Sequence, residues 1–469
     1  MNASIFPENF LQSIANAPGI NLEKFTAVHQ NSPAPTSVRI NPFKSIAFEN
    51  TVEVPWCKGG YYLESRPSFT FDPLFHAGCY YVQEASSMFM DTIYKHIQQD
   101  GESAKVLDLC AAPGGKSTLL ASLLKPEDLL VSNEIIKTRV PVLSDNLTRW
   151  GISNVIVTNN DAKDFARVPG FFDVILVDAP CSGSGMFRKD PEAMEEWSAD
   201  NVNLCHQRQE RILADVYPAL REDGYLIYST CSYSVEENEN ILDWLCREFD
   251  FESIRIPIEA DWGIVESQSA EHKVWGYRFY PDKIKGEGLF AACLRKTAST
   301  RHPSSHKNKS QKPNFKEIDL VKPYINNSED YFYYKVGEDW LVIDRQHKDS
   351  LETLQQYLYI KKSGVRIGKL AGKDLIPDHE LALSLLINKG NILQTELNYD
   401  QAIAYLRRDN FELNIQQKGW SLMNYKGHAL GWAKLLPNRL NNYYPKELRI
   451  LAPRPAEGGD AGAMGLAHG

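Results

Sequence analysis

Short apolar runs, separated by longer stretches of mixed polarity, mark the middle of the chain. Five of them occupy residues 106–110, 129–134, 154–161, 172–180 and 224–232. Each run is followed by a helical or loop stretch, and this alternation is typical of β-α units that build a parallel sheet. The pattern predicts an α/β domain with a doubly wound sheet.

Three local signals add detail to this domain. Residues 286–296 predict one more strand, at the edge of the sheet. Ser234 and Glu237 have the spacing of a capping box, which predicts a helix starting just after Ser234. Pro141 lies within residues 136–151, which otherwise predict one continuous helix, so we expect a kink there.

The composition changes on both sides of this segment. The first hundred residues are mixed and punctuated by proline, a Ser- and Lys-rich stretch follows the last strand, and aromatic strand-like runs come after it. We therefore expect an N-terminal region at 1–100, an α/β domain at 101–297, a linker at 298–314, an intermediate C-terminal domain at 315–390, a last domain at 391–451 and a disordered tail at 452–469.

The overall composition excludes several classes of protein. The 469 residues are 43% hydrophobic, with no apolar run of membrane-spanning length and no signal peptide at the start, so we expect a cytoplasmic protein with no membrane partner. The 8 cysteines form no CxxC pair, and no metal is expected. A net charge of -9 argues against a protein coated with nucleic acid but not against a local basic groove.

The stretch LDLCAAPGGKSTLLAS, residues 107–122, looks at first like a phosphate-binding loop. A Walker A loop needs a glycine where Cys110 stands, and Pro113 lies inside the would-be phosphate nest. The dinucleotide pattern GxGxxG fails as well, because Gly114 and Gly115 are adjacent. What remains is a tight glycine turn between a strand and a helix, where doubly wound sheets bind their ligands.

Acidic residues close the next three predicted strands. Glu134 can hold both hydroxyls of a ribose, Asp161 can meet an adenine amino group, and Asp178 ends the fourth strand. Each of them alone would be an ordinary turn residue. Together, beside the glycine turn, they indicate a nucleoside site without a phosphate requirement, and S-adenosylmethionine fits this description.

Two cysteines, Cys181 and Cys231, follow the fourth and fifth predicted strands. In a parallel sheet both strand ends open on the edge that carries the glycine turn, so we expect both thiols in one crevice. A single cysteine there is usually inert packing, but a thiol beside S-adenosylmethionine suits methylation of carbon 5 of a pyrimidine. The thiolate adds to carbon 6 and makes carbon 5 nucleophilic, and a second thiol can assist its departure.

The motifs CAAPGGK, DAPCSGSG and YSTCS together resemble the NSUN (Nol/Nop/Sun) family of RNA cytosine-5 methyltransferases, and PTSVRIN, QEASSM and RFYPDKIKGEG match it as well. This resemblance runs from near the N-terminus to Lys296. With its C-terminal section the chain resembles the bacterial RsmF-type small-subunit rRNA methyltransferases. The resemblance implies a Rossmann-like class I S-adenosylmethionine methyltransferase core, an N-terminal α+β RNA-binding region and a C-terminal PUA-like α+β/β-rich module.

The resemblance also implies roles for individual residues. Cys231 would be the nucleophile, Cys181 the thiol that helps to release product, and Asp178 a contact to the edge of the base. Lys189 and Arg39 would touch substrate RNA. The cofactor S-adenosylmethionine would be held by Cys110, Ala111, Ala112, Pro113, Gly114, Gly115, Lys116, Glu134, Asp161 and Asp178.

RNA is the expected partner, most directly 16S rRNA or the small ribosomal subunit, and the protein is expected to act as a monomer. Basic residues within 359–373 and 431–445 are individually typical of solvated faces, but after a base-modifying domain they favour RNA docking. The target base must leave its stack to reach Cys231.

Other interpretations stay open. The same chemistry could act on tRNA, or the fold could bind RNA without catalysis as a ribosome-assembly factor. Two thiols at one sheet edge count against the second of these. A Walker-type ATPase is disfavoured by the residue at the first glycine position.

Overall fold

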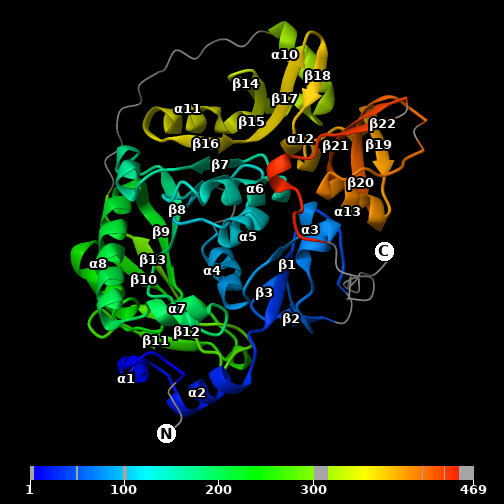
Figure 1. Ribbon diagram of the computed structural model, residues 1–469. Coiled ribbons are helices and arrows are strands. Elements are labelled where there is room, and N and C mark those ends of the chain that lie inside the picture. Colours follow the sequence, from blue (N-terminus) through cyan, green and yellow to red (C-terminus); the bar gives the residue numbers. More distant parts are fainter. Residues whose placement is uncertain are drawn as a thin grey trace.

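The computed structural model describes residues 5–48, 51–98, 103–299, 315–414, 416–437 and 439–453. An α/β core is joined by an N-terminal sheet and by two C-terminal domains that lie along one side of it (Figure 1). Residues 300–314 and 454–469, on which most of the expected linker and tail fall, lie outside the described residues.

A mixed sheet forms the centre of the core, in the order β11-β12-β13-β9-β8-β5-β6-β7-β16, with β10 (Phe251–Ile254) also paired to β13. The five central strands run parallel, which confirms the Rossmann-like α/β fold expected from the apolar runs. Their residues are mostly buried because helices cover both faces. The parallel strands are β5 (Lys105–Asp108), β6 (Leu129–Asn133), β7 (Val155–Thr158), β8 (Phe172–Asp178) and β9 (Leu220–Thr230).

The sheet extends further at both ends than the apolar runs indicate. β13 (Leu289–Lys296) is not an edge strand, because β12 (Trp275–Phe279) and then β11 (Val265–Gln268) lie beyond it. At the other end β16 (Ile360–Ser363), from the C-terminal half, pairs antiparallel with β7. β11 and β16 are short and only partly apolar, so their place is decided by the open strand edges that they cover.

Helices pack on both faces of the sheet, and two of them start where the sequence did not indicate. α6 (Val140–Trp150) begins one residue before Pro141, so the proline sits in the first turn and the expected kink is wrong. α9 (Glu239–Glu248) begins after the expected capping box, and Glu237 lies in the preceding turn instead. The other main helices of the core are α4 (Met90–Ile97), α5 (Gly115–Leu123), α7 (Pro191–Glu196) and α8 (Ala199–Val216).

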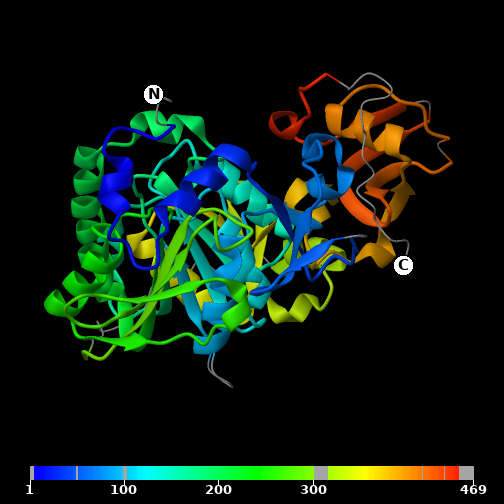
Figure 2. The same cartoon turned by 90° about the horizontal axis from the view of Figure 1, so that it is seen from below.

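The N-terminal residues are divided between two neighbours (Figure 2). α1 (Phe10–Ile14) and α2 (Leu22–Asn31) pack on the core, where Phe10 contacts Phe187 and Phe25 contacts Tyr233. A four-stranded sheet and a short helix follow, and these pack against the last C-terminal domain. They comprise β1 (Thr36–Ile40), β2 (Val52–Val54), β3 (Cys57–Leu63), α3 (Pro73–His76) and β4 (Tyr80–Val82).

The two C-terminal domains each contain a small sheet. The intermediate domain has the strand order β14-β15-β17-β18, and the last domain has β19-β20-β21-β22. These elements are α10 (Phe315–Val321), β14 (Tyr331–Val336), β15 (Asp339–Asp344), α11 (Lys348–Tyr357), β17 (Val365–Ala371), β18 (Asp374–Pro377), α12 (His379–Leu383), β19 (Leu393–Glu396), α13 (Tyr399–Arg407), β20 (Gly419–Tyr425), β21 (His428–Leu436) and β22 (Arg439–Asn442).

Shared hydrophobic cores tie these parts together. Leu74 and Tyr80 of the N-terminal region lie in one buried cluster with Ile403 and Leu406 of the last domain. Trp340 of the intermediate domain shares a second cluster with Trp432 of the last domain. The N-terminal sheet and both C-terminal domains therefore form one packed unit beside the core. Within the described residues, no helix is both long and apolar enough to cross a membrane.

Candidate active site

The two cysteines singled out from the sequence meet at the carboxyl ends of neighbouring strands. Asp178 of β8 lies opposite Ser229 of β9, and each chain reaches its cysteine a few residues later. The Sγ atoms of Cys181 and Cys231 are 3.0 Å apart, and the Cys231 backbone N–H donates to the Cys181 Sγ at 3.3 Å. Both side chains are free thiols and partly exposed. The structure thus brings both thiols together at one edge of the sheet, the place of the expected cysteine crevice.

The turns that carry the cysteines are locked to each other through a glycine. The backbone N–H of Gly185 donates to the Cys231 carbonyl at 2.8 Å, and its own carbonyl accepts from Gly288 N–H at 3.1 Å. A Cβ at position 185 would stand 2.5 Å from the Gly288 oxygen and 2.8 Å from the Cys231 oxygen. The approach of these three backbone segments therefore requires glycine in the motif DAPCSGSG.

Three motifs that lie far apart in the sequence converge behind these turns. The Glu84 carboxylate accepts from the backbone N–H groups of Ser86 and Glu287. Arg188, seven residues after Cys181, forms a buried ion pair with Glu287 at 3.0 Å. Burial raises the pKa of Glu287 to about 7, against the opposing effect of Arg188. The motifs QEASSM and KGEG thus hold the loop that leaves the first cysteine.

A buried carboxylate that the sequence analysis assigned to a helix cap joins both cysteine turns. Glu237 is 0% exposed and accepts from the Ser182 N–H at 2.8 Å and from the Ser182 and Ser232 hydroxyls at 2.5 Å each. Ser182 and Ser232 directly follow Cys181 and Cys231. One side chain therefore fixes the residue after each thiol, and it sets the distance between the two sulfur atoms.

The same carboxylate contributes to the electrostatics of the pair. The hydrogen bond with Cys231 and burial raise the pKa of Cys181 well above its ordinary value, and the charges of Cys231 and Glu237 raise it further. Cys181 therefore stays protonated at neutral pH, with its sulfur in hydrogen-bond contact with Cys231. A protonated thiol beside a second sulfur can donate a proton to that sulfur when it becomes negatively charged.

The glycine turn at the end of β5 has the backbone shape that a ligand-binding turn requires. Gly114 is in the left-handed region at φ 114 and is the N-cap of α5. Two side chains from α6 and the segment before it hold the turn: Arg139 donates to the Ala112 carbonyl at 2.6 Å, and Asn146 donates to the Pro113 carbonyl at 2.7 Å. These two hydrogen bonds hold the turn in place between β5 and α5.

A lysine of this turn connects it to the cysteine strands. Lys116 Nζ lies 2.8 Å from Asp178 Oδ2, and Asp178 Oδ1 accepts from the Ser229 hydroxyl. Burial alone would lower the pKa of Lys116, but the charges of Asp178, Asp108 and Cys231 outweigh it and raise the pKa. Lys116 is therefore a permanent cation between the glycine turn and the two thiols.

Asp108, at the end of β5, is a residue that the sequence analysis missed. It is 0% exposed, and Ser117 donates to its Oδ2 at 2.7 Å. Among the atoms that the structure describes, its Oδ1 has no hydrogen-bond partner. Burial raises the pKa of this carboxyl to about 7. Its position at the end of an apolar strand, just before the glycine turn, could have indicated a functional residue. A buried oxygen without a partner here fits a site in which a bound ligand supplies the missing hydrogen bond.

The remaining acidic residues border the same edge. Glu134 is buried, accepts from the Ile136 N–H at 2.8 Å and lies 3.5 Å from Arg139. Ile135 and Ile136, which follow it, are about half exposed. Asp161 accepts from the Lys163 N–H, so it also serves as a turn residue. Two exposed isoleucines beside a carboxylate offer an apolar surface to a nucleoside base, which the acidic pattern alone does not indicate.

The C-terminal half also contributes to this edge. The backbone of Tyr359, just before β16, accepts from Asn159 N–H at 3.0 Å and donates to the Asn160 side chain at 2.9 Å. Its ring is 60% exposed, and the Lys361 ammonium lies 4.0 Å from the ring centre. An aromatic residue and a cation thus stand next to the loop that carries Asp161.

The structure separates the two residues expected to touch RNA. Lys189 is exposed on the loop after Cys181, in agreement with a contact to substrate. Arg39 is only 3% exposed, so its expected contact with RNA is wrong. Its guanidinium donates to Gln83, Ser122 and Thr118 and stacks over the Trp150 ring. Arg39 joins the N-terminal sheet to the first helix after the glycine turn.

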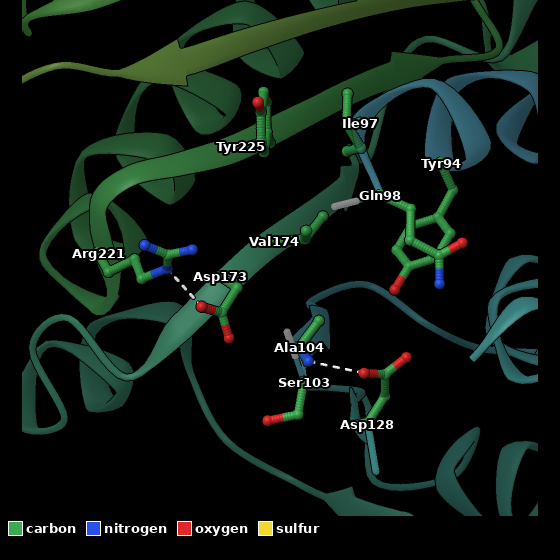
Figure 3. Close-up of a pocket in the computed structure, with 10 residues that line it drawn as sticks. All are labelled: Tyr94, Ile97, Gln98, Ser103, Ala104, Asp128, Asp173, Val174, Arg221 and Tyr225. Atoms are coloured by element: carbon green, nitrogen blue, oxygen red, sulfur yellow. Dashed lines mark hydrogen bonds and ion pairs between the residues drawn. The ribbon is translucent and has the colours of Figure 1, made fainter. Parts of the chain in front are cut away.

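A small cavity of about 30 Å³ lies at the opposite edge of the sheet (Figure 3). Asp173 and Tyr225, at the amino-terminal parts of β8 and β9, line it together with Tyr94 of α4. Arg221 pairs with Asp173 across it. Because ligands of doubly wound sheets bind at the carboxyl ends of the strands, this cavity is not the candidate site.

Comparisons with known proteins cover nearly the whole chain. The family model described as 16S rRNA methyltransferase RsmB/F matches residues 96–295, the N-terminal domain of 16S rRNA methyltransferase RsmF matches residues 6–85, and the methyltransferase RsmF PUA domain matches residues 392–450. The ribosomal RNA small subunit methyltransferase F of Aliivibrio fischeri is 32% identical over an alignment of 478 positions, gaps included, that covers 96% of this chain and 98% of that protein. The protein of the same name from Shewanella piezotolerans is 30% identical, over 94% of this chain and 97% of its own.

Solved structures resemble the core. A methyltransferase homologue from Pyrococcus horikoshii superimposes with a TM-score of 0.52 at 28% identity, covering 62% of this chain and 95% of that chain. NSun6 from the same organism also has a TM-score of 0.52, at 19% identity and with 63% and 100% coverage, and it shares the fold.

Replacing Glu237 by glutamine keeps the shape of the side chain but removes its charge. Because that charge opposes ionisation of Cys181, we expect Cys181 to become reactive at lower pH. The rate of alkylation by iodoacetamide, measured against pH in a Cys231→Ser background, reports this directly. Glu236→Gln, at a neighbouring partly exposed carboxylate, should leave the profile unchanged. An identical profile for Glu237→Gln and its parent would refute the electrostatic role.

Replacing Arg39 by alanine should destabilise the protein without a direct effect on RNA. The change leaves three acceptors without their donor, the buried Gln83 and Thr118 and the partly buried Ser122, at a cost of about 3 kcal/mol. We expect the thermal unfolding midpoint to fall by several degrees, while Arg66→Ala on the exposed surface changes it little. If Arg39→Ala instead weakens RNA binding while the midpoint stays where it was, the assignment as a buried structural residue is incorrect.

Proposed function

This chain belongs to the 16S rRNA methyltransferase RsmB/F family, and we propose that its cysteine crevice methylates carbon 5 of a cytosine in small-subunit rRNA. The family uses S-adenosylmethionine as methyl donor and modifies RNA. The observation that carries the assignment of the crevice is the pair of thiols 3.0 Å apart at the carboxyl ends of β8 and β9.

The residues at the sheet edge fit S-adenosylmethionine. The left-handed turn at Gly114, the unpaired oxygen of Asp108 and the isoleucines beside Glu134 offer a backbone edge, an acceptor and an apolar surface. We propose that residues 110–116 hold the amino-acid part, that Glu134 holds the ribose and that Asp161 reads the adenine. The cofactor would supply a methyl group on a sulfonium, and the Lys116–Asp178 ion pair would keep the cofactor's surroundings polar.

The protein's own groups then account for the covalent steps. The Cys231 thiolate donates an electron pair to carbon 6 of the cytosine, a carbon–sulfur bond forms, and carbon 5 becomes able to accept the methyl group. Asp178 hydrogen-bonds the edge of the ring. After methylation the proton on carbon 5 must leave, and the bond between carbon 6 and Cys231 must break.

Cys181 is placed to serve both of these last events. Its raised pKa keeps it protonated, and its sulfur already contacts Cys231. We propose that it gives its proton to the departing Cys231 sulfur and takes up the proton lost from carbon 5. The net change is the transfer of one proton from carbon 5 to Cys231 by way of Cys181, which regenerates the Cys181 thiol. Cys231 returns to the thiolate form when it releases this proton to solvent.

The substrate is proposed from the relatives and from the architecture. Both relatives compared above are named as small-subunit rRNA methyltransferases, and the chain covers nearly their full length. Methylation of tRNA by the same chemistry remains the alternative. A monomeric state, a cytoplasmic location and independence from metal ions stay predictions.

The two cysteines should give opposite results when replaced. In Cys181→Ala the release step fails, so we expect a covalent protein–RNA adduct that survives a denaturing gel. Cys231→Ala should form no adduct and transfer no methyl group. Cys246→Ala, which removes a thiol on α9 that donates to the Phe251 carbonyl, is the matched control and should behave as wild type. Normal turnover by Cys181→Ala without an adduct would rule out the release role.

The substrate can be identified by mapping. Bisulfite sequencing of small-subunit rRNA from cells without this protein should lack one or more 5-methylcytosines, and the purified protein with S-adenosylmethionine should restore them. If those cells keep all 5-methylcytosines in small-subunit rRNA but lose one in tRNA, the substrate is tRNA.

A further inference from the structure

A groove of about 540 Å³ opens where three parts of the molecule meet. Its walls come from the segment after β1, from the segment after α12 and from the turn between β20 and β21. In Figure 1, α3, α12 and β21 lie side by side at this junction, in agreement with their contacts. The groove therefore exists only when the N-terminal sheet and both C-terminal domains are packed together.

The groove lies away from the cysteine crevice. Lys44 at its wall donates to the Arg149 carbonyl at 2.6 Å, near the C-terminal end of α6. α6 runs back along the sheet toward the start of β7, so its C-terminal end lies at the amino edge of the parallel strands. The thiols lie at the carboxyl edge. A ligand that fills both sites must therefore be long.

The charges that border the groove have one sign. Lys44 and Lys389 line it together with His428, whose pKa is lowered by burial, and among the described lining residues there is no Asp or Glu. In the part of the chain that the structure describes, neither Lys44 nor Lys389 forms an ion pair. The Glu396 carboxylate, whose charge acts on His428, accepts from the Gly427 N–H. These cations repel one another, and a cluster of this kind is stabilised by an anion.

The pKa shifts of Lys44 and His428 agree with an excess of positive charge at the groove. Burial lowers the pKa of Lys44 to about 8, and the positive charges of Lys389 and Arg149 lower it further. Burial also lowers the pKa of His428, and Lys44 and Lys389 add to the effect, against the opposing charge of Glu396. Lys44 uses two of its three hydrogens on the Ala77 and Arg149 carbonyls, so one remains for a ligand.

An exposed aromatic residue stands beside the cations. Phe43, next to Lys44, is 44% exposed, and Leu385 on the facing wall is 39% exposed. Cations that track a backbone and an aromatic ring on which a base can stack form the combination that binds single-stranded nucleic acid. An acidic peptide would use the cations but has no need of the exposed ring, so the observations favour RNA.

We propose that this three-domain groove binds the sugar-phosphate backbone of the substrate RNA at a point remote from the methylated base, with Lys44 and Lys389 on phosphate and Phe43 against a base. The proposal rests on the function assigned above, since it takes the RNA from it. It adds a second docking point that holds the RNA while the target base enters the crevice.

The test uses the full-length protein and small-subunit rRNA, with the variants Lys389→Gln and Phe43→Ala. Lys44 is left in place because it also binds two carbonyls. We expect each variant to weaken RNA affinity by about fivefold to tenfold. For Lys389→Gln, the slope of the logarithm of affinity against the logarithm of salt should decrease by about 0.7 to 0.9. KM for RNA should rise while kcat and the affinity for S-adenosylmethionine stay unchanged.

Lys273→Gln, in the turn between β11 and β12, removes an exposed lysine on a different part of the molecule and serves as the matched control. If Lys389→Gln and Phe43→Ala bind rRNA with the affinity and salt slope of this control, the groove proposal is overturned. Normal binding of free rRNA with weakened binding of the assembled small subunit would also overturn it, because the groove would then hold a protein.

The two proposals fail in different ways. If the wild-type protein methylates rRNA and the groove variants bind it normally, only the groove proposal fails. If the groove variants bind rRNA more weakly but the wild-type protein methylates none, the groove stands and the assigned activity fails.

Discussion

The parallel pairing of β8 with β9 is the constraint on which the site depends. Because Asp178 stands opposite Ser229, both chains leave the sheet at the same edge and bring Cys181 and Cys231 into contact. A slip of one residue would move one sulfur by about 3.3 Å along its strand and turn it to the other face. Glu237 holds the turns in this register by accepting from the residue that follows each thiol.

The parts outside the core are fixed to it and to one another by packing. α1 and α2 pack on the aromatic residues that follow the cysteines and stiffen the two turns. The N-terminal sheet shares its hydrophobic core with the last domain, and β16 extends the central sheet from the intermediate domain. These parts are therefore held at a constant position relative to the two thiols.

Predictions from the sequence succeeded where a signal is local and failed where one residue type serves two purposes. The five strands could be predicted because burial on both faces requires a short continuous apolar run. The turn could be predicted because a positive φ favours glycine. Pro141 predicted a kink but lies in the first turn of α6. Glu237 predicted a helix cap but is buried and accepts hydrogen bonds from two serines. Arg39 reads as an RNA contact, yet it stacks on Trp150 inside the protein. A charged residue carries no mark in the sequence of whether its partner is solvent, ligand or another buried side chain.

The sequence by itself determined the class of fold, because an alternation of apolar runs with helices permits few topologies. It also showed which polar residues follow each parallel strand, and it singled out Cys181 and Cys231 among the cysteines. Only the tertiary structure decided how far the sheet extends, which carboxylate ties the thiols together and where three domains enclose a cationic groove. These features depend on contacts between separate segments of the folded chain. Such contacts are selected by shape and charge complementarity in the folded chain, and no local pattern of residues records them.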